Sequence, residues 1–141
     1  MWAHAPTFTI LGPKNITIKG QAGTETAGQF LLLTPLGVTS RFFLLDTNNG
    51  SLTIPQGTVI NTSVNDTSFR LLQANGNGPF SVNDPLVLLR SGTSAVTVTV
   101  TIPQNAPQGN YSFTVAIATF SDRTAQYENY GDGVMVNLDV T

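Results

Sequence analysis

The sequence predicts an all-β protein built as one antiparallel β-sandwich. Several segments alternate apolar and polar residues with a period of two, which is typical of a strand that buries one face. Clusters of Gly, Pro and Asn separate these segments at intervals of roughly 8–12 residues, and no stretch shows the period of a helix. At 141 residues the chain is long enough to bury a sizeable core.

The clearest strands are predicted in the second half of the chain. Residues 95–102 read Ala-Val-Thr-Val-Thr-Val-Thr-Ile, so the valines share one face with the isoleucine and the threonines share the other. The next strand places apolar side chains at every second position from Tyr111 to Ile117, and the last strand does so over 134–140. Less regular strands are predicted over residues 7–11, 15–19, 29–34, 38–46, 51–54, 68–73 and 86–90.

The stretch from Val96 to Val115 combines a Thr/Val strand, a turn and a returning strand. The turn reads Pro-Gln-Asn-Ala-Pro-Gln-Gly-Asn-Tyr and ends at Tyr111. This stretch resembles the penultimate hairpin of bacterial and archaeal immunoglobulin-like modules, including those attached to secreted glycoside hydrolases. The resemblance implies an immunoglobulin-like antiparallel β-sandwich, and it implies a structural role for Tyr111 as a tyrosine corner. We expect an N-terminal extended arm or first strand over residues 1–12 and one β-sandwich domain over 13–141.

The scarcity of charged residues and the lack of long apolar runs together exclude two classes of protein. Only 10 % of the residues are Asp, Glu, Lys or Arg, against about a quarter in an ordinary soluble protein. A net charge of −2 provides no basic surface for nucleic acid. No run approaches the roughly 20 apolar residues of a membrane-spanning helix. Neutral polar residues must therefore supply most of the hydrated surface. The chain has 20 Thr, 9 Ser and 12 Asn.

Four Asn-x-Ser/Thr triplets fit a secreted or surface-exposed protein. They begin at Asn15, Asn61, Asn65 and Asn110, and each is a candidate site for an N-linked glycan. A chain this rich in Asn, Thr and Ser also forms such triplets by chance, so both interpretations stay open. Residues 1–6 lack the features of a signal peptide, and the neutral surface leads us to expect an extracellular or cell-surface protein whose leader has been removed.

Groups suited to catalysis or metal binding are few. His4 is the one histidine, there is no cysteine, and no Gly-x-Ser-x-Gly elbow occurs. We therefore expect neither an enzyme nor a cofactor. A structural Ca²⁺ stays open because it needs oxygen ligands alone, and Asp122, Glu128, Asn129 and Asp132 lie between the last two predicted strands.

The loop over residues 121–132 is the strongest candidate for a binding segment. It gathers Arg123, Tyr127 and Tyr130 in a chain that otherwise avoids charge. Tyr and Arg offer contact area and hydrogen bonds at a low entropic cost, so the loop is a candidate for binding a glycan or a protein. The alternative is a solvated hairpin loop whose tyrosines pack on their own sandwich.

Three predicted strands are apolar on both faces. They cover residues 30–33, 42–45 and 86–89. A two-layer sandwich covers only one face of each strand, so a bulge, a loop or another subunit must cover the other. The N-terminal segment adds an alternating set of apolar residues, Trp2, Pro6, Phe8 and Ile10. This segment either completes a neighbour's sheet as a donor strand or pairs in its own domain as the first strand.

These features predict a non-enzymatic extracellular structural protein. We expect a subunit of a surface filament, such as a pilus, that self-assembles into a homo-oligomer or polymer by strand addition and apolar contacts. The composition resembles that of surface filament and sheath proteins of archaea and thermophilic bacteria. The alternative is an accessory carbohydrate- or protein-binding immunoglobulin-like module of a larger secreted protein.

Overall fold

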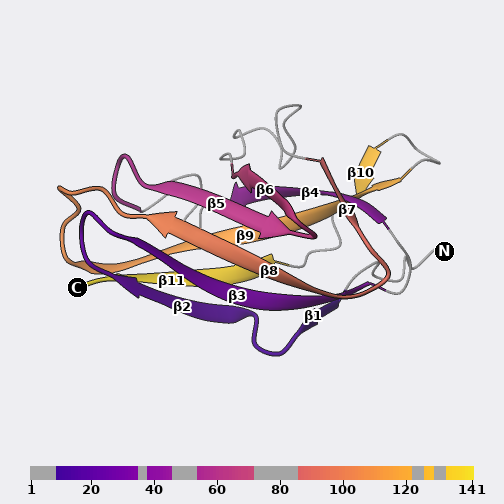
Figure 1. Cartoon of the computed structure of the whole chain (residues 1–141), viewed down its shortest axis with the longest axis horizontal. Helices are drawn as coiled ribbons and strands as arrows, with labels where there is room; N and C mark the ends of the chain where they lie inside the picture. The colour runs from indigo at the N-terminus through magenta and orange to yellow at the C-terminus, as the bar shows by residue number, and fades with distance from the viewer. Residues whose placement is uncertain (1–8, 35–37, 46–53, 72–85, 122–125, 129–132) are drawn as a thin grey trace.

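The structure, a computed structural model of the chain, describes residues 9–34, 38–45, 54–71, 86–121, 126–128 and 133–141. These residues form strands and contain no helix, so none of them belongs to a helix that could cross a membrane (Figure 1). The strands are β1 (Thr9–Leu11), β2 (Asn15–Gly20), β3 (Glu25–Thr34), β4 (Val38–Leu45), β5 (Val59–Val64), β6 (Thr67–Arg70), β7 (Leu86–Leu89), β8 (Gly92–Thr101), β9 (Gly109–Ser121), β10 (Gln126–Glu128) and β11 (Gly133–Val140).

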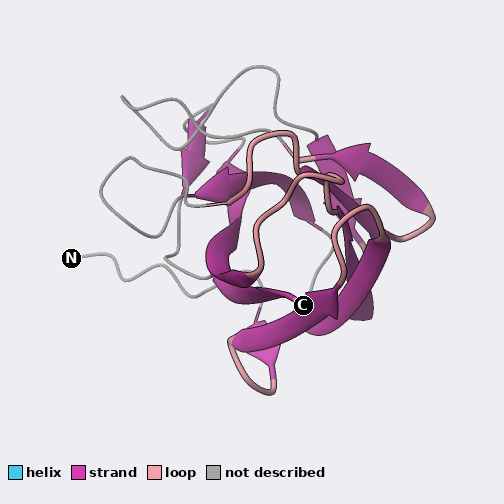
Figure 2. Ribbon diagram, turned by 90° about the vertical axis from the view of Figure 1, so that its left-hand side faces the viewer, coloured by secondary structure: helices cyan, strands magenta, loops and turns pink. Residues whose placement is uncertain are grey.

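The strands form two facing sheets. One sheet has five strands in the order β1-β3-β8-β5-β6, and the other has six, in the order β2-β11-β9-β4-β7 with β10 paired to β9. All neighbouring strands run antiparallel except β2 and β11, which are parallel. Seen along the strands, the sheets curve around a shared interior (Figure 2). The predicted all-β antiparallel sandwich is therefore confirmed.

The period-two patterns translate directly into buried and exposed faces. Along β8, Val96, Val98 and Val100 are fully buried, whereas the threonines between them are only half-buried. The same alternation in β11 buries Val136 and Leu138 and leaves Met135 exposed. Each fully buried aliphatic side chain contributes roughly 1.5–3 kcal/mol relative to an exposed one, so these faces define the core.

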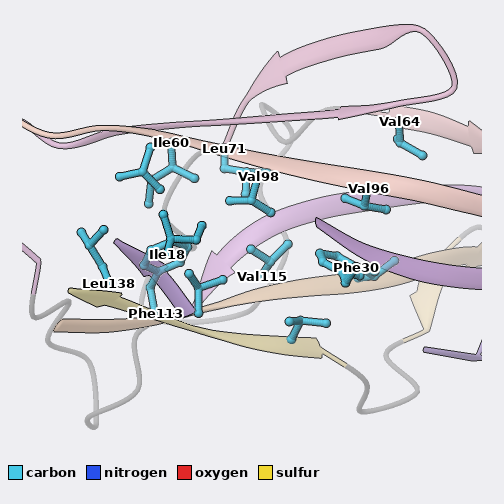
Figure 3. Close-up of a cluster of buried hydrophobic side chains, with 14 of the residues drawn as sticks. Ile18, Phe30, Ile60, Val64, Leu71, Val96, Val98, Phe113, Val115 and Leu138 are labelled. Atoms are coloured by element: carbon cyan, nitrogen blue, oxygen red, sulfur yellow. The ribbon is translucent and has the colours of Figure 1, made fainter. Parts of the chain in front are cut away.

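The core lies between the sheets and draws on strands of both (Figure 3). Its largest fully buried side chains are Phe113, Ile18, Leu32, Ile60, Leu89, Ile102, Ile117, Leu138 and Val96. Because both sheets supply these side chains, the inner faces are covered within one molecule. The outer faces and the sheet edges are what the molecule presents to others.

The N-terminal strands connect the two sheets. β1 pairs with β3 in the five-stranded sheet, and the chain then crosses so that β2 pairs with β11 in the other sheet. Ile18 of β2 approaches β3 so closely that a Cβ on Gly28 would lie 3.0 Å from its Cγ1. A glycine at this position therefore lets the edges of the two sheets meet.

Some strand boundaries differ from the sequence-based expectation. β5 was not expected, β3 begins at Glu25 rather than at residue 29, and Ile54 lies outside any strand. The sequence of β5 does not show the usual alternation of apolar and polar residues. Its inward positions are Ile60, Thr62 and Val64, and the threonine interrupts the apolar series. Residues 51–53 of the expected strand 51–54 lie outside the described residues.

Candidate functional site

The N-terminal arm divides into a part within the sheet and a part outside the described residues. Thr9 pairs with Leu33 and Ile10 with Leu32, and Ile10 is only 6 % exposed. Ile10 is therefore part of its own sheet, which is the second of the two alternatives for the arm at this position. Trp2, Pro6 and Phe8 lie outside the described residues.

Three leucines form an exposed apolar area beside β1, on the outer face of the five-stranded sheet. Leu11, Leu31 and Leu33 are 36 %, 42 % and 39 % exposed, and Leu11 lies directly opposite Leu31 across the β1–β3 pair. We call these three residues the leucine face. Thr93 and Ala95 of β8 pair with Leu33 and Leu31, are exposed and uncharged, and extend the leucine face. Because Phe30 and Leu32 are buried, β3 is apolar on both faces here, as expected.

The other two segments expected to be apolar on both faces are only partly described. In β7, Val87 and Leu89 are buried and Leu88 is 60 % exposed, which again makes the strand apolar on both faces. Residues 42–45 lie in β4, and their side chains are outside the described part of the structure.

Both edges of the six-stranded sheet carry a hydrogen bond from a side chain of the other sheet. At the β2 edge, the Thr26 hydroxyl donates to the Lys19 carbonyl oxygen at 2.8 Å. At the β7 edge, the Asn65 side-chain amide donates to the Leu88 carbonyl oxygen at 3.1 Å. These contacts occupy main-chain acceptors of edge strands, which an added strand would otherwise use. Sequence reasoning missed both contacts, although Asn-Asp between two short strands is a recognisable turn signal.

Tyr111 packs at the end of the turn that precedes β9. Its hydroxyl donates a hydrogen bond of 2.8 Å to the carbonyl oxygen of Pro107, four residues upstream, and its side chain is half-buried. This is the local contact that the resemblance implies for Tyr111.

The four candidate glycosylation sites differ in their surroundings. Asn15 and Asn110 are exposed, and Asn61 is half-buried. Asn65 is also half-buried, and besides its bond to Leu88 it accepts a hydrogen bond of 3.3 Å from the Ser94 hydroxyl. The side chain of Asn65 therefore has two hydrogen-bond partners on other strands, and the Asn15 side-chain oxygen accepts one longer bond, of 3.5 Å, from Asn137.

A polar groove lies on the outer face of the six-stranded sheet, over β2, β11 and β9. Its volume is about 420 Å³, and Asn137 and Asp139 of β11 are among the residues that line it. Asn137 faces Thr17 and Ser112 on the flanking strands, and its amide contacts the Asn15 side chain at 3.5 Å. The full lining consists of Thr17, Asn110, Tyr111, Ser112, Asn137, Leu138 and Asp139. Sequence reasoning did not find this site, because its residues come from three distant segments.

The candidate binding loop is only partly described. Tyr127 lies in β10 and pairs with Phe120 of β9, but its side chain is outside the described part, as are Arg123 and Tyr130. Of the residues considered for calcium, Asp122, Asn129 and Asp132 are also outside. Among the residues that the structure describes, no three or more His, Cys, Asp or Glu side chains gather as a metal site would require.

Comparisons with other proteins support the fold. No protein-family model matches the chain, and no curated protein matches it. The PapD-like (ASH) domain 7 of human CEP192 is similar in structure, with a TM-score of 0.52 and 15 % identity over 99 % of this chain and 90 % of that one. The N-terminal domain of PorA has a TM-score of 0.54 and 10 % identity over 94 % and 92 %.

A third similar structure is much longer than this chain. A family 123 glycoside hydrolase from Clostridium perfringens matches with a TM-score of 0.51 and 13 % identity over 96 % of this chain but only 27 % of its own length. At these identities the similarity concerns the arrangement of strands alone. The chain therefore has the immunoglobulin-like β-sandwich fold that PapD-like domains also have.

Proposed function

We propose that this chain is a non-enzymatic structural protein of the extracellular space or cell surface, a subunit that assembles with copies of itself into a filament such as a pilus. The observation that carries the proposal is the leucine face, where Leu11, Leu31 and Leu33 lie together, each more than a third exposed. The chain has only 10 % charged residues, so little charge opposes contact between copies.

The leucine face contributes part of the required binding free energy, not all of it. Full burial of a leucine is worth roughly 1.5–3 kcal/mol, so covering the exposed part of each one gives on the order of 1 kcal/mol. Association costs about 4–15 kcal/mol in lost translational and rotational freedom. A second contribution is needed, and main-chain hydrogen bonds from strand addition can supply it.

The N-terminal arm is the natural source of an added strand. Thr9 pairs with Leu33, and β3 ends one residue later at Thr34. β3 therefore offers a partner to at most one further residue of the arm. Trp2, Pro6 and Phe8 fall at alternate positions, so an extended arm carries all three on one face.

Sedimentation velocity and negative-stain electron microscopy of the full chain test the proposal. We expect the sedimentation coefficient to rise with concentration and filaments to appear. Trp2→Ser and Phe8→Ser in the arm should reduce assembly. Met135→Ser is the matched control, because it removes an exposed apolar side chain from the outer face of the other sheet. A chain that remains monomeric at high concentration contradicts the proposal.

The polar groove supports a second candidate function, in which the chain is an accessory carbohydrate-binding module. Its volume of about 420 Å³ falls in the range of small-molecule sites. Amide, hydroxyl and carboxylate groups such as those of Asn137, Ser112 and Asp139 can donate and accept the hydrogen bonds that sugar hydroxyls require.

Binding to insoluble polysaccharides tests this second function. A monomeric chain should bind, and Asn137→Ala or Asp139→Ala should abolish the binding if the groove is the site. If the loop over residues 121–132 is the site instead, Tyr127→Ala and Tyr130→Ala should abolish it. A chain that binds no polysaccharide in its unmodified form contradicts this function.

A further inference from the structure

Among the described strands, the ordered paths of the two sheets end at four strands, and β10, which pairs with the end of β9, lies off these paths. The five-stranded sheet ends at β1 and β6, and the six-stranded sheet ends at β2 and β7. Natural proteins protect such edges with charges, prolines or covering groups, because unpaired main-chain groups invite pairing with another chain. The protection of each edge therefore indicates which of them is open to a partner.

Three of the four edges are protected. β2 contains Lys19, whose carbonyl oxygen already accepts a hydrogen bond from Thr26. The carbonyl oxygen of Leu88 in β7 accepts one from Asn65. β6 ends at the exposed Arg70, and its other outward residues are polar.

β1 differs from β2 and β6 in having no charged residue, and from β7 in the leucine face that it shares with β3. It contains Thr9, Ile10 and Leu11 and no charged residue. Its outward side chain Leu11 lies beside Leu31, so the leucine face borders this edge. We propose that β1 and the leucine face together form the acceptor surface for the N-terminal arm of a second copy of this chain. This inference rests on the proposed self-assembly and names the surface that it uses.

The arm of a second copy fits the chemistry of this surface. An added strand forms main-chain hydrogen bonds with the free side of β1, and its alternate side chains stand beside Leu11. Trp2, Pro6 and Phe8 are large and apolar, and the arm segment 1–8 contains no acidic or basic residue apart from His4. Pro6 lacks an N–H group, which an outermost strand tolerates.

The direction of strand addition decides whether assembly continues to a filament. The arm runs directly into β1, so an antiparallel addition is self-complementary and can close about a two-fold axis as a dimer. A parallel addition is heterologous and repeats as an open chain of subunits unless the rotation forms a ring. A filament therefore requires the parallel arrangement, in which each copy donates its arm to the next.

Cross-linking locates the acceptor edge. The chain has no cysteine, so single-cysteine variants react at one site only. A tagged full chain carrying Thr7→Cys is mixed with an untagged full chain carrying Leu11→Cys, and a short thiol-reactive cross-linker is added. Leu88→Cys is the matched control, because Leu88 is an exposed leucine on another edge strand. We expect the tagged–untagged product to be at least about tenfold more abundant with Leu11→Cys, since binding raises the effective concentration to the millimolar range.

Charge substitution tests the leucine face independently. Leu31→Lys should raise the concentration for half-maximal assembly by about tenfold or more, and Leu88→Lys should leave it unchanged. Leu31→Thr, which preserves strand propensity, should produce a smaller shift in the same direction. Circular dichroism melting of each variant shows that the sandwich has formed.

The outcomes separate this inference from the proposed function. In one outcome the unmodified chain assembles and Trp2→Ser weakens assembly, but Leu31→Lys assembles normally and the cross-link forms at Leu88→Cys. The acceptor strand is then β7, so the inference is wrong while self-assembly is supported. If the unmodified chain never assembles, self-assembly itself is wrong and the inference falls with it. Preferential cross-linking at Leu11→Cys together with weakened assembly of Leu31→Lys supports both.

Discussion

The side chain of Asn65 holds β7 at the carbonyl oxygen of Leu88, across the gap between the two sheets. Asn65 and Asp66 form the two-residue turn between β5 and β6 with φ values of +51° and +64°. Positive φ at both positions is what a type I′ hairpin turn requires. The turn aims the Asn65 amide at Leu88 and its oxygen at the Ser94 hydroxyl. One residue therefore satisfies the turn geometry and closes an edge of the six-stranded sheet.

Substitutions at Asn65 should separate these two roles. Asn65→Gly preserves the turn and removes both hydrogen bonds, so we expect the free energy of unfolding to fall by about 1–2 kcal/mol. Asn65→Ala should cost roughly 1 kcal/mol more, because a Cβ disfavours positive φ. Urea denaturation of protein from a host without N-glycosylation measures both changes. Asp66→Gly is the control, because Asp66 is the exposed second turn residue, and it should leave the free energy of unfolding nearly unchanged. An Asn65→Gly protein as stable as the unmodified chain would show that the two hydrogen bonds of Asn65 contribute nothing.

The surroundings of each asparagine should decide which of the four Asn-x-Ser/Thr triplets carry glycans. In the folded, secreted fraction from a host that N-glycosylates, we expect occupancy at Asn15 and Asn110, which are exposed. Asn65 should be unmodified in that fraction, because its half-buried amide binds Leu88 and Ser94. Glycopeptide mass spectrometry measures each occupancy. Equal occupancy at Asn65 and Asn15 would contradict this assignment.

Tyr111 should stabilise the turn before β9 through its hydroxyl. Tyr111→Phe keeps the ring and removes the 2.8 Å hydrogen bond to the Pro107 carbonyl oxygen, so we expect a loss of about 1 kcal/mol in the free energy of unfolding. Thr24→Val is a suitable control, since it removes an equally local bond, from the Thr24 hydroxyl to the Gln21 carbonyl oxygen at 2.7 Å, in an exposed turn elsewhere. Guanidinium denaturation compares the two. A larger loss for Thr24→Val than for Tyr111→Phe would argue against a special role for the tyrosine.

The sequence predicts the strands best where one face is purely apolar. β8 and β11 alternate without interruption, so their inward sets could be assigned residue by residue. β3 is also predicted, because Leu31 and Leu33 alternate with Phe30 and Leu32, so one pair must face outward. Period two indicates which residues share a face, and burial of one face then leaves the other exposed.

The contacts between distant segments could not be predicted in this way. The parallel pairing of β2 with β11 and the groove around Asn137 depend on how the two sheets are ordered, which local patterns do not encode. The same holds for the Asn65–Leu88 bond, in which a turn residue of one sheet meets an edge strand of the other. The triplet at Asn65 suggests a glycan, and the two hydrogen-bond partners that the structure gives its side chain lie 23 and 29 residues away along the chain.

Thr62 offers a way to stabilise the chain from within. It is fully buried on the inward side of β5, and its hydroxyl has no hydrogen-bond partner among the described residues. A buried hydroxyl without a partner loses its hydration, so an apolar side chain of the same shape is favoured. We expect Thr62→Val to raise the free energy of unfolding by about 1 kcal/mol, measured by urea denaturation. Thr97→Val is the matched control, since the Thr97 hydroxyl accepts a 2.9 Å hydrogen bond from the Gln29 amide and its loss should not stabilise the fold. A destabilised Thr62→Val protein would contradict this prediction.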